Sequence, residues 1–201
     1  MSIITVFTGK YCNEELAIKE ILEKTGYKYL TDSDIAAKAG RLSDFPESKI
    51  LKAFSAKVSV FNQFTHDKER SIAYLKLAVA ETITEDNLLI NGFTSLLIPA
   101  GIAHILKVCL IADMKYRLSI AGSSGMSENE ALKMLHKSDE DRISWTRSIL
   151  EKDDPWDVSI YDMVLPTDKM NSKEIADLVQ NTLDKDVLKT SADGKKAIQD
   201  F

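Results

Sequence analysis

The sequence has few of the residues that cross-link small proteins or bind metals. Its two cysteines, Cys12 and Cys109, exclude a disulfide framework, show no metal-ligand spacing, and fit a protein of the reducing cytoplasm. No apolar run approaches the roughly 20 residues that cross a bilayer, so we expect no membrane partner. The net charge is −5 and lysines and arginines form no cluster, which argues against a nucleic-acid partner.

Strand-like and helical segments alternate along the 201 residues. Short apolar runs predict strands, and amphipathic patterns between them predict helices. This alternation is typical of a parallel sheet that helices cover on both faces. The sequence therefore predicts a three-layer α/β/α fold with a five-stranded parallel sheet, whose strands are expected at 3–7, 28–31, 87–91, 107–112 and 162–165.

Several predicted helices begin with capping residues. The segments 127–130 (SENE) and 31–34 (TDSD) each place a hydroxyl residue three positions before a carboxylate, which is the pattern of a capping box. Asn171 precedes a further amphipathic pattern. Residues 66–85 carry the longest uninterrupted helical pattern, so we expect the longest helix there.

The opening segment 4–22, ITVFTGKYCNEELAIKEIL, has the layout of a phosphate-binding loop, with a strand, a glycine-containing turn and a helix. An intact loop reads G-x-x-x-x-G-K-[ST], and its last three positions contact phosphates and magnesium. With Gly9 as the first glycine, those positions hold Glu14, Glu15 and Leu16. Because two carboxylates already occupy the anion-favouring end of the helix, the loop keeps its position but loses its chemistry.

Four other segments resemble a known kinase family. They are GYKYLTDSDI at 26–35, ADMKYRL at 112–118, the Asp139-Glu-Asp-Arg142 segment with Arg147, and Tyr161-Asp162-Met163-Val164 after an aromatic-rich loop. The pattern resembles the cytidylate kinase-like family, within the P-loop nucleoside monophosphate kinase fold. The resemblance covers most of residues 1–183.

The resemblance implies roles for particular arginines. In these kinases a lid segment supplies arginines that neutralise the transferring phosphoryl group, and Arg142 and Arg147 occupy that segment as candidate catalytic residues. Arg117 lies where family members also place an arginine. A structural alternative stays open, in which Arg142 pairs with Asp139 or Glu140 on the helix surface.

Five residues are candidates for binding nucleotide or phosphate: Gly9, Lys10, Asn13, Gly92 and Arg117. Lys10 and Asn13 are the groups near the loop that could offset its carboxylates. Gly92 ends the third predicted strand, where the family has glycine followed by arginine. Phe93 follows here, so one cationic phosphate contact is lost.

We expect one α/β domain at 1–185. It would contain a helical insertion on the acceptor side at 41–85 and a lid-like region at 123–160. Within the insertion, residues 41–65 are expected to fold over the mouth of the cleft and to expose aromatic side chains, namely Phe54, Phe61 and Phe64. The tail at 186–201 begins another helix, which either docks on this domain or starts a further one.

Two functions stay open from the sequence. The altered loop favours a degenerate nucleotide-binding or regulatory module with weak or no phosphotransferase activity. The alternative is an active ATP-dependent kinase of CMP or dCMP that uses a non-standard phosphate loop. A nucleotide is the expected ligand, and ATP and Mg²⁺ are the cofactors that the resemblance allows. A protein partner, a domain after the C-terminus and a homo-oligomer all stay open.

Overall fold

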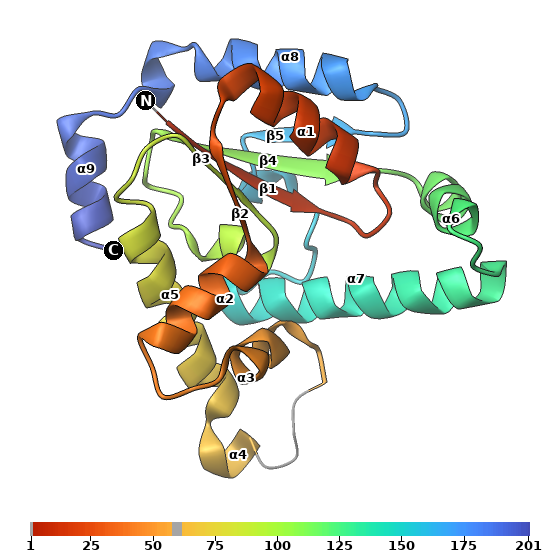
Figure 1. Cartoon of the computed structure of the whole chain (residues 1–201), viewed down its shortest axis with the longest axis horizontal. Coiled ribbons are helices and arrows are strands. Elements are labelled where there is room, and N and C mark those ends of the chain that lie inside the picture. Colours follow the sequence, from red (N-terminus) through yellow and green to blue (C-terminus); the bar gives the residue numbers. More distant parts are fainter. Residues whose placement is uncertain (1, 58–61) are drawn as a thin grey trace.

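A computed structural model describes residues 2–57 and 62–201 of the chain. Its centre is an all-parallel five-stranded sheet in the order β2-β3-β1-β4-β5 (Figure 1). The strands are β1 (Ile3–Thr8), β2 (Lys28–Thr31), β3 (Leu88–Asn91), β4 (Ile105–Ile111) and β5 (Met163–Pro166). Each boundary lies within two residues of the boundary predicted from the sequence, which confirms the strand predictions.

One face of the sheet is covered by α1 (Glu14–Thr25) and α8 (Ser172–Leu183), which lie side by side above the strands in Figure 1. Side chains alternate across a strand, so Ile4 and Val6 of β1 both point to this face. They pack in one buried cluster with Ile21 of α1.

The opposite face is covered by α2 (Asp32–Arg41), α5 (Asp67–Thr82), α7 (Glu128–Leu150) and α9 (Ala192–Gln199). Ile3 and Phe7, the intervening residues of β1, join a second buried cluster with Leu75 of α5 and Trp145 of α7. Two helical layers therefore enclose the sheet, and the predicted three-layer α/β/α fold is confirmed.

The capping residues start helices as predicted. Thr31, Ser127 and Asn171 each form a capping box at the start of α2, α7 and α8. The prediction of the longest helix was wrong, because α7 has 23 residues and α5 has 16. The polar run at 136–142 interrupts the apolar stripe of α7, so its periodicity understates its length.

The other α-helices of the described residues are α3 (Glu47–Leu51), α4 (Asn62–Thr65) and α6 (Met114–Ser123). Phe54, in the 3₁₀-helix Lys52–Phe54 that follows α3, was expected to be exposed, but it is 8% exposed and stacks on Phe93 with ring centroids 5.1 Å apart. Phe64 is 76% exposed, as expected, and Phe61 lies outside the described residues.

The tail forms the predicted helix, α9, and this helix packs on the domain. Ile198 belongs to the core cluster beneath α2 and α5, and Phe201 packs against the same cluster. The hydroxyl of Thr190 donates to Asp86 at 2.7 Å. The other alternative, that the tail starts a further domain, is not decided by this packing. Within the described residues, no helix is long and apolar enough to cross a membrane.

Candidate functional site

The loop between β1 and α1 has the strand-loop-helix layout of a phosphate loop, but its backbone is unusual. Tyr11 and Asn13 both have left-handed backbone conformations, with φ of 62° and 56°. Asparagine adopts such a conformation readily, whereas it is costly for a tyrosine, and strained residues of this kind cluster at functional loops. Glu14 and Glu15 form the first turn of α1, and Leu16 is 51% exposed beyond them.

Gly9 is required by close packing rather than by a left-handed backbone. A Cβ atom at this position would lie 2.9 Å from Cys12 Sγ and 3.4 Å from both Arg117 Cζ and Trp156 Cη2. A larger residue would therefore push the loop away from the side chains behind it. The structure gives Gly9 this packing role at the base of the loop.

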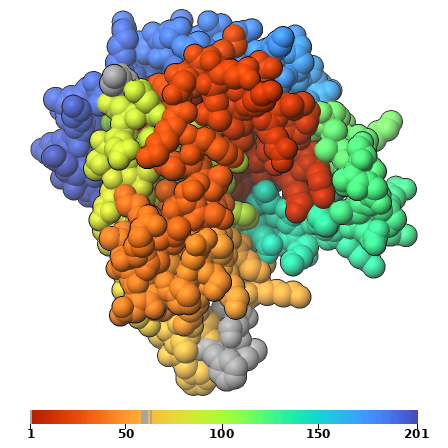
Figure 2. Space-filling model, viewed as in Figure 1, coloured from red at the N-terminus to blue at the C-terminus, as the bar shows by residue number. Residues whose placement is uncertain are grey.

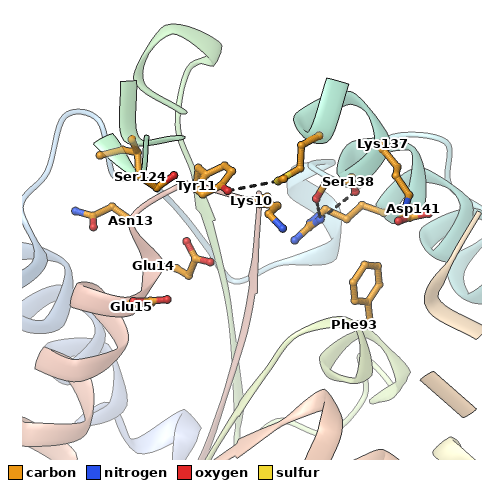
Figure 3. A pocket seen from close by; sticks show the side chains of 13 residues that line it. Lys10, Tyr11, Asn13, Glu14, Glu15, Phe93, Ser124, Lys137, Ser138 and Asp141 are labelled. Atoms are coloured by element: carbon orange, nitrogen blue, oxygen red, sulfur yellow. Dashed lines mark hydrogen bonds between the residues drawn. The ribbon is translucent and has the colours of Figure 1, made fainter. Parts of the chain in front are cut away.

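A cavity of about 900 Å³ opens between this loop and α7. Figure 2 shows it as a hollow between the start of α1 and the helices α6 and α7, and Figure 3 shows its walls. Its charged residues come from both walls: Lys10, Glu14, Glu15, Lys137, Asp141 and Arg142. Three cations therefore face three carboxylates, so the cavity has no excess of positive charge.

Arg142 is the most constrained cation of this cavity. Its Nε donates to the carbonyl oxygen of Thr8, the last residue of β1, at 2.6 Å, and its Nη1 donates to the carbonyl and hydroxyl oxygens of Ser138. The guanidinium also lies 5.3 Å from the ring centroid of Phe93. No carboxylate among the described residues forms an ion pair with it, so the structural alternative, a pairing with Asp139 or Glu140, is not found.

Asp139 pairs instead with Arg117 of α6. Both nitrogens at the end of the guanidinium reach the carboxylate, with Nη1–Oδ2 at 2.9 Å and Nη2–Oδ1 at 2.7 Å. The Nε of Arg117 donates to the carbonyl oxygen of Lys10 at 2.9 Å. Arg117 is 6% exposed, so it supports the loop from behind.

Arg147 lies away from both the loop and the cavity. It is on the exposed end of α7, where its Nε contacts Asp153 at 2.6 Å, and both side chains are largely in solvent. The structure therefore separates the two candidate lid arginines, because it brings only Arg142 to the cavity wall.

Burial changes the acidities of the groups in the loop. It raises the pKa of Glu14, and Arg142 and Lys10 only partly oppose this. Burial likewise raises the pKa of the Cys12 thiol, although Arg117 acts in the opposite direction. The fully buried Cys12 is therefore held as a thiol, which argues against the reactive thiolate that a helix N-terminus favours.

A second cavity, of about 240 Å³, lies at the carboxyl ends of β1, β2 and β3. Glu14, Phe93 and Arg142 line both cavities, so the two adjoin. Gly92 lies in the smaller one with φ of 119°, and a Cβ atom there would collide with the carboxylate of Asp32. Gly92 is thus needed to admit Asp32.

The sequence pattern at 31–34 indicates only a capping segment for Asp32. Its carboxylate accepts hydrogen bonds from the backbone N–H groups of Phe93 and Thr94, each at 2.8 Å, and from the hydroxyl of Thr94. Burial raises its pKa, and these donors oppose that rise. Its position directly after the second strand was the available signal, because ligands of open α/β sheets bind at carboxyl ends of strands.

Of the predicted binding residues, Lys10 and Asn13 line the larger cavity, Gly92 lines the smaller one, and Gly9 and Arg117 line neither. Arg142, predicted as a catalytic residue, lines both cavities. Lys137 and Asp141 were missed, although the four-residue spacing between Lys137 and Asp141, and between Ser138 and Arg142, puts each pair on one face of α7. In the part of the chain that the structure describes, no group of three or more histidine, cysteine or acidic side chains could hold a metal ion.

The insertion contacts α7 beside the cavity. The backbone N–H of Ala56 donates to Asp141 at 2.7 Å, and Phe54 meets Trp145 edge-on with ring centroids 4.9 Å apart. This end of the insertion therefore lies next to Arg142 rather than behind the sheet. That the insertion acts as a lid on the acceptor side stays a prediction.

The sheet order, the loop after β1 and the helices facing it define the fold of the P-loop kinases. The sequence model of the cytidylate kinase-like family matches residues 3–169, and the chain belongs to that family. No curated protein matches the chain.

Two solved structures show the same fold. An uncharacterised protein from Eubacterium ventriosum ATCC 27560 is 14% identical with a TM-score of 0.66, and the match covers 92% of this chain and 99% of that one. Shikimate kinase from Bacteroides thetaiotaomicron is 8% identical with a TM-score of 0.53, with coverage of 92% and 99%. At these identities the likeness extends to the fold alone.

Proposed function

We propose that this chain is a nucleotide-binding or regulatory module of the cytidylate kinase-like family with weak or no phosphotransferase activity. One observation carries the proposal: Glu14 and Glu15 form the first turn of α1, where an intact phosphate loop has glycine and lysine. Both side chains face the larger cavity in Figure 3.

The expected loss of activity follows from electrostatics. Phosphoryl transfer depends on cations and backbone N–H groups that are fixed around the transferring group. A helix N-terminus attracts anions, and in this chain two carboxylates take that position. An efficient transfer by the usual mechanism would lack its lysine, and each such contact is worth orders of magnitude in rate.

Family membership suggests a nucleotide with Mg²⁺, and the loop does not fit the usual way of holding them. The position of the magnesium-binding hydroxyl is Leu16, which is half exposed. Lys10, Lys137 and Arg142 are the cations of the larger cavity that could meet phosphate groups. We therefore propose a nucleotide as the ligand without assigning a metal site. A cytoplasmic location, with a protein partner or homo-oligomer, belongs to this proposal.

One observation favours the alternative, an active ATP-dependent kinase of CMP or dCMP. Arg142 places a guanidinium on the cavity wall against the carbonyl oxygen of Thr8, immediately before the loop. At this position, a cationic side chain of α7 would replace the lysine that the loop lacks.

Calorimetric titration with ATP, GTP, CMP and dCMP, with and without Mg²⁺, and an assay of CMP-dependent ADP formation separate the two functions. We expect binding of a nucleotide without CMP-dependent ADP formation. Sustained turnover with CMP or dCMP would refute the proposal. In that case R142Q should abolish turnover and R147Q should not, because only Arg142 lines the cavity.

A further inference from the structure

The smaller cavity adjoins the larger one at the carboxyl ends of β1, β2 and β3, and its charges are unsuited to a monophosphate. Its ionisable residues among those described are Glu14, Asp32 and Arg142. A phosphate dianion entering it would meet two carboxylates and one guanidinium. Burial already raises the pKa of both carboxylates, and a further anion would penalise their ionised forms again.

The guanidinium of Arg142 is also largely occupied. Its Nε donates to Thr8, and its Nη1 donates twice to Ser138, so three of its five N–H bonds are used within the protein. Phosphate is bound most strongly by two nitrogens of one guanidinium acting together. Of the guanidinium nitrogens of Arg142, only Nη2 has no hydrogen-bond acceptor among the described residues. Arg142 therefore cannot present two free nitrogens to one phosphate.

The remaining polar groups of the cavity include hydrogen-bond acceptors. The carboxylate of Glu14 lines the space and, when ionised, only accepts, whereas the hydroxyl of Ser33 both accepts and donates. A ligand rich in hydroxyl or amino groups supplies donors to such acceptors.

The size of the cavity points in the same direction. Sites for drug-sized ligands span roughly 300–1,000 Å³, and the larger cavity, at about 900 Å³, lies in that range. The smaller cavity, at about 240 Å³, lies below it and suits a molecule of monosaccharide size.

We propose that the smaller cavity binds a small, uncharged or cationic molecule with several hydroxyl or amino groups, such as an amino sugar, in place of a nucleoside monophosphate. The inference rests on the proposed function in one respect, because it takes the larger cavity as the nucleotide-binding site. Glu14 is placed to accept from the amino group, and the Nη2 of Arg142 is placed to donate to a hydroxyl.

The test is a titration of the ¹⁵N-labelled full chain with matched pairs of probes. Backbone amide chemical shifts report the binding. The pairs are D-glucosamine with D-glucosamine 6-phosphate, and D-ribose with D-ribose 5-phosphate. We expect saturable shifts at residues 31–33 and 91–93 with the unphosphorylated member of a pair. Binding of its phosphate ester should be weaker by about tenfold or more, since the phosphate gains no forked contact.

Two variants locate the effect. E14Q should weaken glucosamine binding by about tenfold, since it removes a charge-assisted hydrogen bond, and should change ribose binding by less than about twofold. K137Q, which alters only the larger cavity, should change neither. Far-UV circular dichroism and thermal melting show whether each variant is folded.

Tighter binding of the phosphorylated member, or no shifts at 31–33 and 91–93 with any probe, would overturn the proposal. Titration of the same sample with ATP, followed at Lys10, Asn13 and Ser138, reports on the larger cavity separately. A failure of nucleotide binding there would contradict the proposed function and leave the inference about the smaller cavity standing on its own probes.

Discussion

The ion pair between Arg117 and Asp139 should stabilise the domain and the loop together. The two side chains are 7% and 19% exposed, and they are joined by two hydrogen bonds of 2.7 and 2.9 Å. D139N would leave the guanidinium buried without its counter-charge. Breaking a buried pair in this way costs about 3–5 kcal/mol, a large part of the roughly 5–15 kcal/mol that holds a domain folded.

The double variant R117M/D139L should be far less destabilised than the sum of its single variants, because it buries no charge. The matched control is the pair between Arg147 and Asp153, which has a similar distance of 2.6 Å but side chains that are 64% and 82% exposed. R147Q should cost less than about 0.5 kcal/mol, since solvent screens exposed pairs.

Urea unfolding measures these free energies, with the fluorescence of Trp145 and Trp156 as the signal, and amide hydrogen exchange follows the loop at 9–13. We expect faster exchange in the loop of R117M, because the hydrogen bond from Arg117 to Lys10 is lost. A cost below about 1 kcal/mol for D139N would refute the structural role. So would a loss of nucleotide binding in R117M with unchanged stability, which would make Arg117 a ligand contact.

Three further predictions follow from the same geometry. Calorimetry should show that E14G/E15K raises the affinity for ATP by about tenfold or more, through removal of two carboxylates from the α1 N-terminus, whereas E23K at its far end should not. F54A should lower the free energy of unfolding by about 3–5 kcal/mol in urea titrations, because Phe54 is 8% exposed and packed between aromatic rings. Burial raises the pKa of Cys109 to about 12, so the unfolded state loses its thiol proton first as the pH rises. The stability that Cys109 contributes should be complete below about pH 8.5 and reduced by about 1–2 kcal/mol at pH 10, and C109A should remove this part of the pH dependence.

The fold could be predicted from the sequence because its signals are local. Buried parallel strands are short apolar runs, and capping boxes mark helix starts within four residues. The length of α7 could not be predicted in this way, because the polar run at 136–142 interrupts its apolar stripe while the backbone continues as a helix. Tertiary packing, rather than periodicity, decides its extent.

The candidate site was predictable only where it is local. The positions of Glu14 and Glu15 follow from the spacing to Gly9, and the structure puts both in the first turn of α1. Sequence spacing offered Asp139 as a partner for Arg142, three residues away. The structure gives Asp139 to Arg117, which is 22 residues away on the neighbouring helix. Pairing between helices depends on which faces meet, and one sequence does not contain that information.

The charges on the two walls of the larger cavity are reversed relative to a usual phosphate loop, and this reversal explains the altered loop. A usual phosphate loop holds its anion from the α1 side, with a lysine and backbone N–H groups at the helix N-terminus. Here Glu14 and Glu15 outnumber Lys10 on that side, while Lys137 and Arg142 outnumber Asp141 on the α7 wall opposite. Arg142 cannot move freely, because its Nε is bonded to Thr8 at the end of β1. An anion in this cavity would therefore be held from α7, and its binding would depend on how firmly α7 is anchored by Asp141 to the insertion and by Trp145 to the core.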